Sequence, residues 1–153
     1  MGVVLIRRAT PEEATAAADI YLASRAAAGA LIPPAAHDDE DTRRWMRDDL
    51  FVRAEVWLAF AADTPAGVLT LEGSDRLEQL YVLPDAQGTG VGTALVAHAK
   101  AQRPRGLQLW AFASNTPARA FYERHGFVAV EHTDGSGNEE HAPDVRYRWL
   151  PGD

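Results

Sequence analysis

The sequence predicts a single mixed α/β domain built around one central sheet. Its 153 residues suffice for one substantial core, and the 46% apolar and 24% charged content is typical of a globular protein. Short apolar segments separated by tight turns occupy the middle of the chain, and strand and helix patterns alternate after them. We therefore expect one domain over residues 1–153, with a mixed, mostly antiparallel sheet of about seven strands flanked by four helices.

The N-terminal third predicts one strand followed by two helices. Residues 3–8 have the apolar character of a strand. The first helix is expected over residues 10–28, because Thr10 can cap it, a proline follows at the first helical position, and Glu13 completes a capping box. A second, strongly charged helix is expected over residues 37–51.

The middle of the chain changes to an extended pattern. Strands are expected at residues 54–61, 67–72 and 76–83, separated by turn sequences at 63–67 and 73–75. Because such short connections join neighbouring strands, these segments predict an antiparallel meander.

Strands and helices alternate in the rest of the chain. The expected elements are a helix at 90–103, a strand at 107–112, a helix at 116–125, and strands at 127–132 and 145–150. A polar loop is expected between the last two strands.

Composition disfavours several classes of protein. Without cysteine there is no disulfide, thiolate metal site or cysteine nucleophile, and five scattered histidines predict no metal site. The net charge of −7 disfavours nucleic-acid binding, which needs clustered basic surface. Residues 1–8 lack the layout of a signal peptide, and no apolar run reaches the length of a membrane span, so we expect a cytoplasmic protein without membrane contact.

The most informative segment is a glycine-rich turn within Leu-Tyr-Val-Leu-Pro-Asp-Ala-Gln-Gly-Thr-Gly-Val-Gly-Thr, residues 80–93. Glycines allow close approach to an anion, and free N–H groups at a helix start bind phosphate without a cationic side chain. Two nucleotide-binding signatures do not match. A Walker loop needs a lysine where the chain has none, since Lys100 is its only lysine, and a dinucleotide fingerprint needs a glycine at Thr93.

The segment resembles the pyrophosphate loop of the GNAT acetyltransferases, Gln/Arg-x-x-Gly-x-Gly/Ala, through Gln87, Gly90 and Gly92. The preceding Leu-Tyr-Val-x-Pro is similar to the fourth strand of that family. A second family segment follows at the right distance, Asn115-x-x-Ala118-x-x-Phe-Tyr-Glu-Arg-His-Gly-Phe. The expected order of elements also matches the GNAT fold over essentially the whole chain.

The resemblance implies that acetyl-CoA binds where the fourth and fifth strands splay apart, with no metal. Backbone groups of Leu80 and Val82, around Tyr81, would pair with the pantetheine arm, and the Val82 N–H would polarise the thioester carbonyl. Asn115 and Ala118 would line the far side of the cofactor. The pyrophosphate contacts would come from Gln87 and from the amides of Gly88, Thr89, Gly90, Val91, Gly92 and Thr93.

The resemblance also implies direct transfer of an acetyl group to a primary amine, within a ternary complex. Tyr122 occupies the position of the general acid for the CoA thiolate, beside the cofactor; the alternative is a tyrosine that only packs on a helix face. A base is needed because amines arrive protonated, and neutralising a lysine-like amine at pH 7 costs roughly 4–5 kcal/mol. Glu78 is the candidate, directly or through water, because it has the same strand parity as Leu80 and Val82; the alternative is a solvated strand glutamate.

The acceptor is not defined by these motifs. A small-molecule amine and a peptide amine both remain open, in a pocket expected from the first two helices and residues 133–144. The alternative function is a non-catalytic acyl-CoA-binding regulatory module on the same fold. A homodimer is also expected, because Val145, Tyr147 and Trp149 alternate with arginines and would bury a face against a second subunit.

Overall fold

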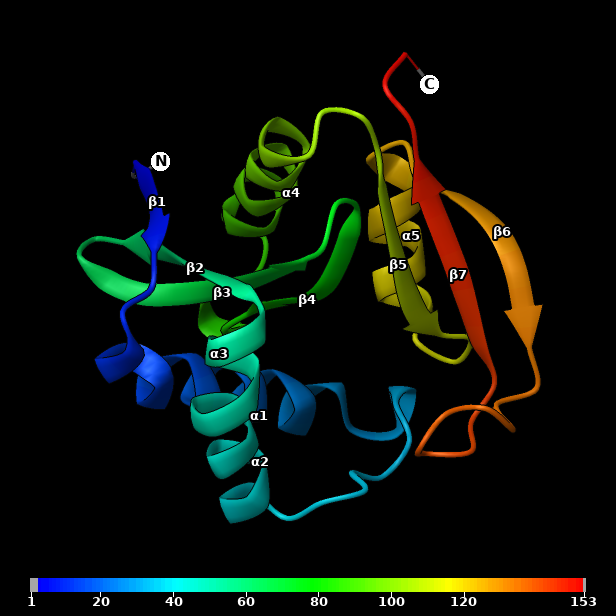
Figure 1. The fold of residues 1–153 in the computed structure, drawn as a ribbon, viewed down its shortest axis with the longest axis horizontal. Coiled ribbons are helices and arrows are strands. Elements are labelled where there is room, and N and C mark those ends of the chain that lie inside the picture. The colour runs from blue at the N-terminus through cyan, green and yellow to red at the C-terminus, as the bar shows by residue number, and fades with distance from the viewer. Residues whose placement is uncertain (1–2, 153) are drawn as a thin grey trace.

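The computed structural model describes residues 3–152 and contains one seven-stranded sheet in the order β1-β2-β3-β4-β5-β7-β6 (Figure 1). Neighbouring strands are antiparallel except for β4 and β5, which are parallel. The strands are β1 Val4–Arg8, β2 Glu55–Ala61, β3 Thr64–Glu72, β4 Arg76–Val82, β5 Leu107–Phe112, β6 Val128–Thr133 and β7 Asp144–Trp149. The predicted mixed, mostly antiparallel sheet is therefore confirmed.

Helices cover both faces of the sheet (Figure 1). They are α1 Ala14–Ala28, α2 Asp39–Trp45, α3 Phe51–Arg53, α4 Val91–Gln102 and α5 Thr116–Arg124. A π-helical turn over Met46–Leu50 joins α2 to α3, so the second predicted helix continues without a break to Arg53. Among residues 3–152, no helix is long and apolar enough to cross a bilayer.

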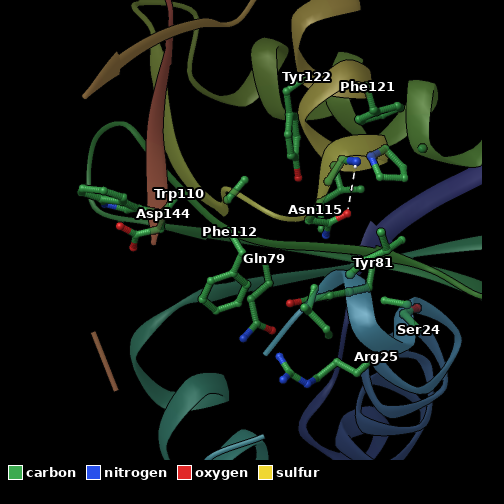
Figure 2. Close-up of a pocket in the computed structure, with 18 of the residues that line it drawn as sticks. Ser24, Arg25, Gln79, Tyr81, Trp110, Phe112, Asn115, Phe121, Tyr122 and Asp144 are labelled. Atoms are coloured by element: carbon green, nitrogen blue, oxygen red, sulfur yellow. Dashed lines mark hydrogen bonds between the residues drawn. The ribbon is translucent and has the colours of Figure 1, made fainter. Parts of the chain in front are cut away.

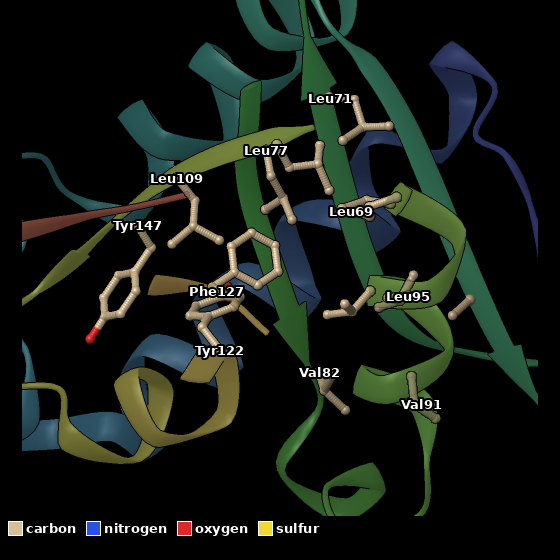
Figure 3. Close-up of a cluster of buried hydrophobic side chains, with 14 of the residues drawn as sticks. Leu69, Leu71, Leu77, Val82, Val91, Leu95, Leu109, Tyr122, Phe127 and Tyr147 are labelled. Atoms are coloured by element: carbon tan, nitrogen blue, oxygen red, sulfur yellow. The ribbon is translucent and has the colours of Figure 1, made fainter. Parts of the chain in front are cut away.

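Two buried clusters hold the layers together, one on each face. The larger cluster joins α4 and α5 to the sheet and includes Leu69, Leu95 and Phe127 (Figure 3). The other joins α1 and the π-helical turn to the opposite face and includes Ile20 and Val68. Leu69 and Val68 fall in different clusters because successive strand residues point to opposite faces. Helices therefore cover both faces of the sheet in the region where the strands carry apolar residues on both faces.

The predicted start of the first helix is present. Residues 11–13 form a 3₁₀ turn that leads into α1, and the Glu13 carboxylate accepts the Thr10 backbone N–H at 2.9 Å. Arg7 donates to the same carboxylate at 2.8 and 2.7 Å. These hydrogen bonds, with that from Arg7 the strongest, lower the pKa of Glu13 to about 2. The first strand and the first helix are therefore joined by one charged contact.

The turn between β2 and β3 is shorter than predicted. It consists of Ala62 and Asp63, with φ of 52° and 64°, which is the left-handed pair of a two-residue hairpin. As a result β3 begins at Thr64, three residues before the predicted start. Pro65 lies at a register shift between β2 and β3, where a strand tolerates a residue without an N–H group.

The last strand does not offer the face that was expected to contact a second subunit. Val145 and Tyr147 are fully buried within this chain, in the cluster that includes Tyr122 and Phe127. The reason given for a homodimer is therefore wrong, because α5 and the sheet already cover these side chains. The homodimer itself stays a prediction.

Candidate functional site

The parallel strands β4 and β5 separate along their length. Their only paired position among the described residues is Arg76 with Gln108, at the start of both strands. Beyond it β4 continues to pair with β3, and β5 with β7. The separation opens a cavity of about 1200 Å³, lined by β4, β5, the end of α1, one side of α5, the glycine-rich turn and the loop before β7 (Figure 2).

The edge of β4 that faces this cavity keeps free backbone groups. Leu83 donates its N–H to Ala66 at 2.8 Å, toward β3. Because successive residues of an antiparallel strand face opposite neighbours, Val82 and Leu80 turn their N–H groups toward the gap. The Val82 carbonyl also points away from β3, since it accepts from Ser24 Oγ at 2.8 Å. This edge can therefore pair with an extended ligand.

The glycine-rich turn presents a row of unpaired N–H groups at the end of the gap. Within the described chain, no protein acceptor takes the backbone N–H of any residue from 88 to 93. Gly90, with φ of 93°, is the N-cap of α4, so the positive end of the helix dipole adds to this row. Such a row binds an anionic phosphate group without a cationic side chain.

Helix α5 closes the other side of the cavity. A Cβ atom on Gly92 would lie 3.2 Å from the Phe121 ring, so α4 and α5 approach closely at the glycine turn. Asn115 is the N-cap of α5, and its Oδ1 accepts the Ala118 N–H at 3.4 Å. Asn115 and Ala118 both line the cavity, opposite the edge of β4.

Tyr122 belongs to both the core and the cavity. Its ring packs 5.6 Å from that of Phe127, measured between centroids, and only 8% of the residue is exposed. Its hydroxyl projects into the cavity (Figure 2), and no group of residues 3–152 hydrogen bonds to it. Burial raises the pKa of the Tyr122 phenol, so the hydroxyl stays protonated at neutral pH and can donate.

Glu78 lines the cavity, but its side chain does not share a face with Leu80 and Val82. Glu78 is an extra residue in β4, since Leu77 and Gln79 pair with successive residues of β3. Because of this bulge, the side chain of Glu78 points to the opposite face of β4 from the one expected by simple alternation along the strand. The side chain instead turns to the face that carries α3.

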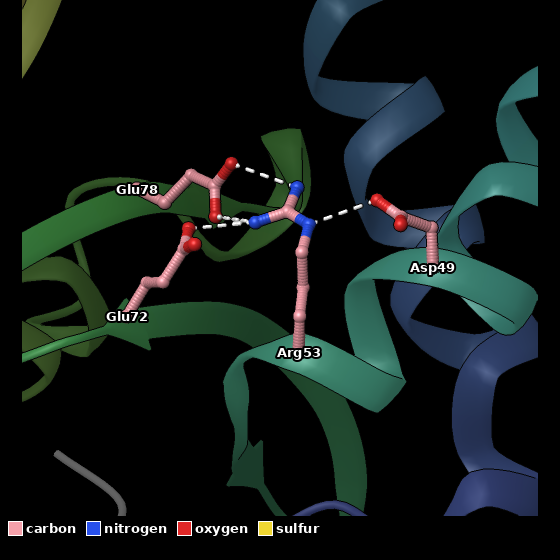
Figure 4. A network of polar contacts seen from close by, with 4 residues as sticks. All are labelled: Asp49, Arg53, Glu72 and Glu78. Carbon is pink, nitrogen blue, oxygen red and sulfur yellow. Dashed lines mark hydrogen bonds and ion pairs between the residues drawn. The ribbon is translucent and has the colours of Figure 1, made fainter.

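There Glu78 forms a two-pronged ion pair with Arg53 (Figure 4). The nitrogen–oxygen distances are 2.9 and 3.1 Å, and Arg53 also contacts Glu72 at 2.6 Å and Asp49 at 2.8 Å. The hydrogen bonds with Glu78 raise the pKa of Arg53. Glu78 is thus held at the cavity wall by a cation from α3.

The cavity brings together most of the site residues predicted from the sequence. Two of them do not line it: the Thr89 hydroxyl turns back to the Ala86 carbonyl, and the Val91 side chain is buried in the core. Their backbone N–H groups still belong to the row at residues 88–93. The predicted residues that line the cavity are Glu78, Leu80, Tyr81, Val82, Gln87, Gly88, Gly90, Gly92, Thr93, Asn115, Ala118 and Tyr122.

Three further lining residues, Ser24, Arg25 and Gln79, were not singled out from the sequence. Ser24 and Arg25 lie near the end of α1, which contacts β4. Ser24 and Val82, which form one of these contacts, are 58 residues apart in the sequence. A helix pattern gives no indication of such a distant contact. The polar character of Gln79 in a buried strand was the one available signal.

Comparison with known proteins agrees with this geometry. The family model described as an acetyltransferase (GNAT) domain matches residues 50–129. The peptidyl-lysine N-acetyltransferase YjaB of Salmonella typhimurium is 36% identical over 80 residues, which make up 52% of this chain and 54% of that protein. The chain spans about half the length of the curated relatives it matches.

Solved structures share the fold over nearly the whole chain. The solution structure of the apo form of YjaB from Escherichia coli is 26% identical, with a TM-score of 0.79, and the match covers 98% of this chain and 99% of that one. The PaiA N-acetyltransferase from Thermoplasma acidophilum, solved in complex with coenzyme A, has a TM-score of 0.74 at 22% identity, covering 97% and 99%. Since the family model matches more than half of the chain and the fold agrees, the chain belongs to the GNAT acetyltransferase family.

Proposed function

We propose that this protein is an acetyl-CoA-dependent N-acetyltransferase that transfers the acetyl group directly to a primary amine. One observation carries the proposal. The unpaired N–H row at residues 88–93 lies at the end of a gap whose wall is the free edge of β4 and whose opposite side carries the Tyr122 hydroxyl.

The residues of this cavity fit coenzyme A. The row at residues 88–93 would hold the pyrophosphate, and Gln87 lies beside it. The N–H groups of Leu80 and Val82 would pair with the amide-containing pantetheine arm, as a strand edge pairs with an extended peptide. When bound, acetyl-CoA supplies a thioester, whose carbonyl carbon is the electrophile for an amine.

The chain supplies groups for both charges that develop in the reaction. The Val82 N–H would donate to the carbonyl oxygen as negative charge builds on it, and it is already aligned by the strand. Tyr122 would donate its phenol proton to the departing sulfur. Because the chain has no cysteine, an acyl-cysteine intermediate is not available and we propose direct transfer.

Glu78 is the proposed base for the acceptor amine, acting through water. Arg53 occupies one lone-pair direction on each carboxylate oxygen, and a carboxylate has about four such directions, so Glu78 can still accept a proton relayed from the cavity. The two hydrogen bonds that hold Glu78 against Arg53 support a relay rather than direct contact with the amine.

The acceptor is proposed to be an amine of a small molecule or a peptide. The relative from Salmonella typhimurium is a peptidyl-lysine N-acetyltransferase, which supports an amine acceptor in general. The cavity reaches beyond the cofactor side to the end of α1 and to residues 133–144, which leaves room for that second substrate.

Thermal unfolding tests the binding part of this proposal. A ligand that binds only the folded state at 100 times its Kd adds about 2.7 kcal/mol, which raises the Tm of a chain of this size by roughly 5–10 °C. Acetyl-CoA and CoA should produce this shift, whereas ATP and NAD at the same concentration should not. A shift with ATP or NAD and none with CoA would contradict the proposal.

A further inference from the structure

The part of the cavity on the α1 side of β4 contains an arginine without an acidic partner. Arg25 lies in the last turn of α1, is half-buried, and lines the cavity. Its Nη2 donates to the Pro33 carbonyl at 3.1 Å, and its guanidinium stacks 5.8 Å from the Tyr21 ring centroid. Among residues 3–152 no carboxylate forms an ion pair with it. A half-buried charge without a counter-ion favours a ligand of opposite charge.

Gln79 adds a second unsatisfied polar group to the same region. Its Oε1 is buried and has no hydrogen-bond partner in the described chain. The Gln79 amide and the Arg25 guanidinium both project into the part of the cavity that lies across β4 from Tyr122 (Figure 2). Since no protein contact fixes which end of this amide faces the cavity, it can turn its N–H donors toward an anion.

The acidic residues of the cavity do not neutralise Arg25. Glu78 is engaged by Arg53 through two hydrogen bonds. Asp144 accepts from the Asn138 amide at 3.2 Å. Glu140 also lines the cavity but forms no ion pair among the described residues. The guanidinium therefore remains available for an anionic group of a ligand.

The end of α1 is fixed next to the proposed reaction centre. Ser24 precedes Arg25 and donates to the Val82 carbonyl at 2.8 Å, on the residue whose N–H faces the gap. A small molecule held at Arg25 would therefore extend only a short way to place another of its groups beside Val82.

We infer that Arg25 and Gln79 form a carboxylate subsite, so that the acceptor is a small molecule carrying both a primary amine and a carboxylate. The inference rests on the proposed function and names its substrate class. Arg25 would hold the carboxylate with two parallel N–H bonds, which a lysine could not reproduce, and Gln79 would donate a third. The amine of the same molecule would then lie at Val82.

Matched sets of acceptors test the contribution of the carboxylate separately from that of the rest of the molecule. Phenylalanine, methionine and lysine are each assayed as the free acid, as the carboxamide and as the decarboxylated amine, with release of free thiol from acetyl-CoA as the readout. In whichever of the three series fits the cavity, we expect a higher kcat/KM for the free acid than for the carboxamide or the decarboxylated amine.

Two variants test Arg25 and Gln79, and a third variant serves as the control. Arg25→Gln removes the charge, and Gln79→Glu places a carboxylate beside the Arg25 guanidinium, where it would compete with the carboxylate of the acceptor. Each should lower kcat/KM for the free acid roughly 10²-fold, the loss typical when one partner of a buried charge pair is removed, with less than about twofold effect on the carboxamide. Arg105→Gln removes the same charge from an exposed turn outside the cavity and should not lower kcat/KM for the acid. The Tm shift with CoA verifies that each variant is folded.

The outcomes distinguish this inference from the proposed function. If acids and carboxamides react equally, or if Arg25→Gln lowers both alike, the carboxylate subsite is wrong while the acetyltransferase stands. If no amine reacts although CoA raises the Tm, the proposed function is wrong. Calorimetric titration of the CoA complex with the same acids and carboxamides then decides the subsite: acid binding lost in Arg25→Gln supports it, and equal binding of both forms overturns it.

Discussion

Tyr122 and Glu78 illustrate how differently two polar side chains are held at one cavity. The Tyr122 ring is packed in the core and its hydroxyl is free of partners among residues 3–152, so a donor is aimed at the gap by apolar contacts alone. Glu78 lies across β4 from Tyr122 and is held in position by its ion pair with Arg53. The first arrangement keeps a proton available at neutral pH, and the second keeps a carboxylate at the wall.

Tyr122→Phe should separate the proposed chemistry from packing. The variant keeps the ring and removes only the donor, so kcat should fall on the order of 10²–10⁴-fold while the Kd for CoA stays the same. Burial raises the pKa of Tyr122 above its ordinary value near 10, so its proton is retained as pH rises to 10, and the loss in the variant should not be rescued at alkaline pH.

Tyr147→Phe is the matched control for this measurement. Tyr147 lies in the same buried cluster, but its hydroxyl contacts Arg119 and Glu123 and does not line the cavity. The control should lose stability and keep kcat. A normal kcat in Tyr122→Phe would mean that Tyr122 only packs and that solvent protonates the thiolate.

Glu78→Gln should affect the rate in a pH-dependent way. If Glu78 relays the proton, the rate should fall on the order of 10²-fold near pH 7 and recover in part at alkaline pH, where more amine is already neutral. Glu72→Gln is the control, because Glu72 also pairs with Arg53 but does not line the cavity. An unchanged pH–rate profile in Glu78→Gln would assign proton removal to solvent and leave Glu78 as an anchor for Arg53.

The start of α4 and the turn before it form the element on which cofactor binding depends. The turn needs a left-handed backbone at Gly88 and Gly90, with φ of 78° and 93°, and this conformation exposes the N–H groups at residues 88–93. The helix dipole then adds a favourable field for an anion. A side chain with negative charge in this turn would oppose both effects.

Gly90→Asp should abolish the rise in Tm that CoA produces. The new carboxylate would meet the pyrophosphate where free N–H groups are required. Gly73→Asp is the matched control, since Gly73 has a φ of 61°, lies in the distant β3–β4 turn, and has no neighbouring atom within 4 Å of the place that a Cβ atom would take. Both variants should lose about 1–2 kcal/mol from left-handed strain, but only Gly90→Asp should lose CoA binding. Equal CoA affinity in Gly90→Asp and wild type would show that this turn does not hold the pyrophosphate.

The helix starts, which carry local capping signals, were predicted well, whereas a strand boundary and a bulge that depend on strand register were not. The Thr10 and Glu13 cap and the glycine start of α4 lie within a few residues of the helices they begin, so the sequence alone locates them. The Ala62–Asp63 turn was misplaced because the proline and glycine that suggested a turn lie inside β3. The bulge at Glu78 follows from its register with β3, which strand periodicity does not contain.

The whole cavity is assembled from segments that are far apart in the sequence. The glycine turn and α5 could be assigned to one site through the two family segments, whereas the end of α1 and residues 133–144 carry no motif that connects them to it. The fold brings the end of α1 to β4 through the contact of Ser24 with Val82. The cofactor side was therefore predictable in detail from the sequence. On the acceptor side the expected first helix and residues 133–144 do line the cavity, whereas the expected second helix does not. The individual residues there, such as Arg25 and Gln79, required the packed structure.

Amine-dependent release of free thiol from acetyl-CoA tests the proposed acetyl transfer most directly. The chain has no cysteine, so all thiol detected in the assay comes from CoA. We expect thiol release that requires both the protein and a primary amine, in equal amount to the N-acetylated product. If acetyl-CoA raises the Tm but no amine releases thiol faster than in the protein-free reaction, the proposed transferase activity is contradicted, and the protein is instead a non-catalytic acyl-CoA-binding module.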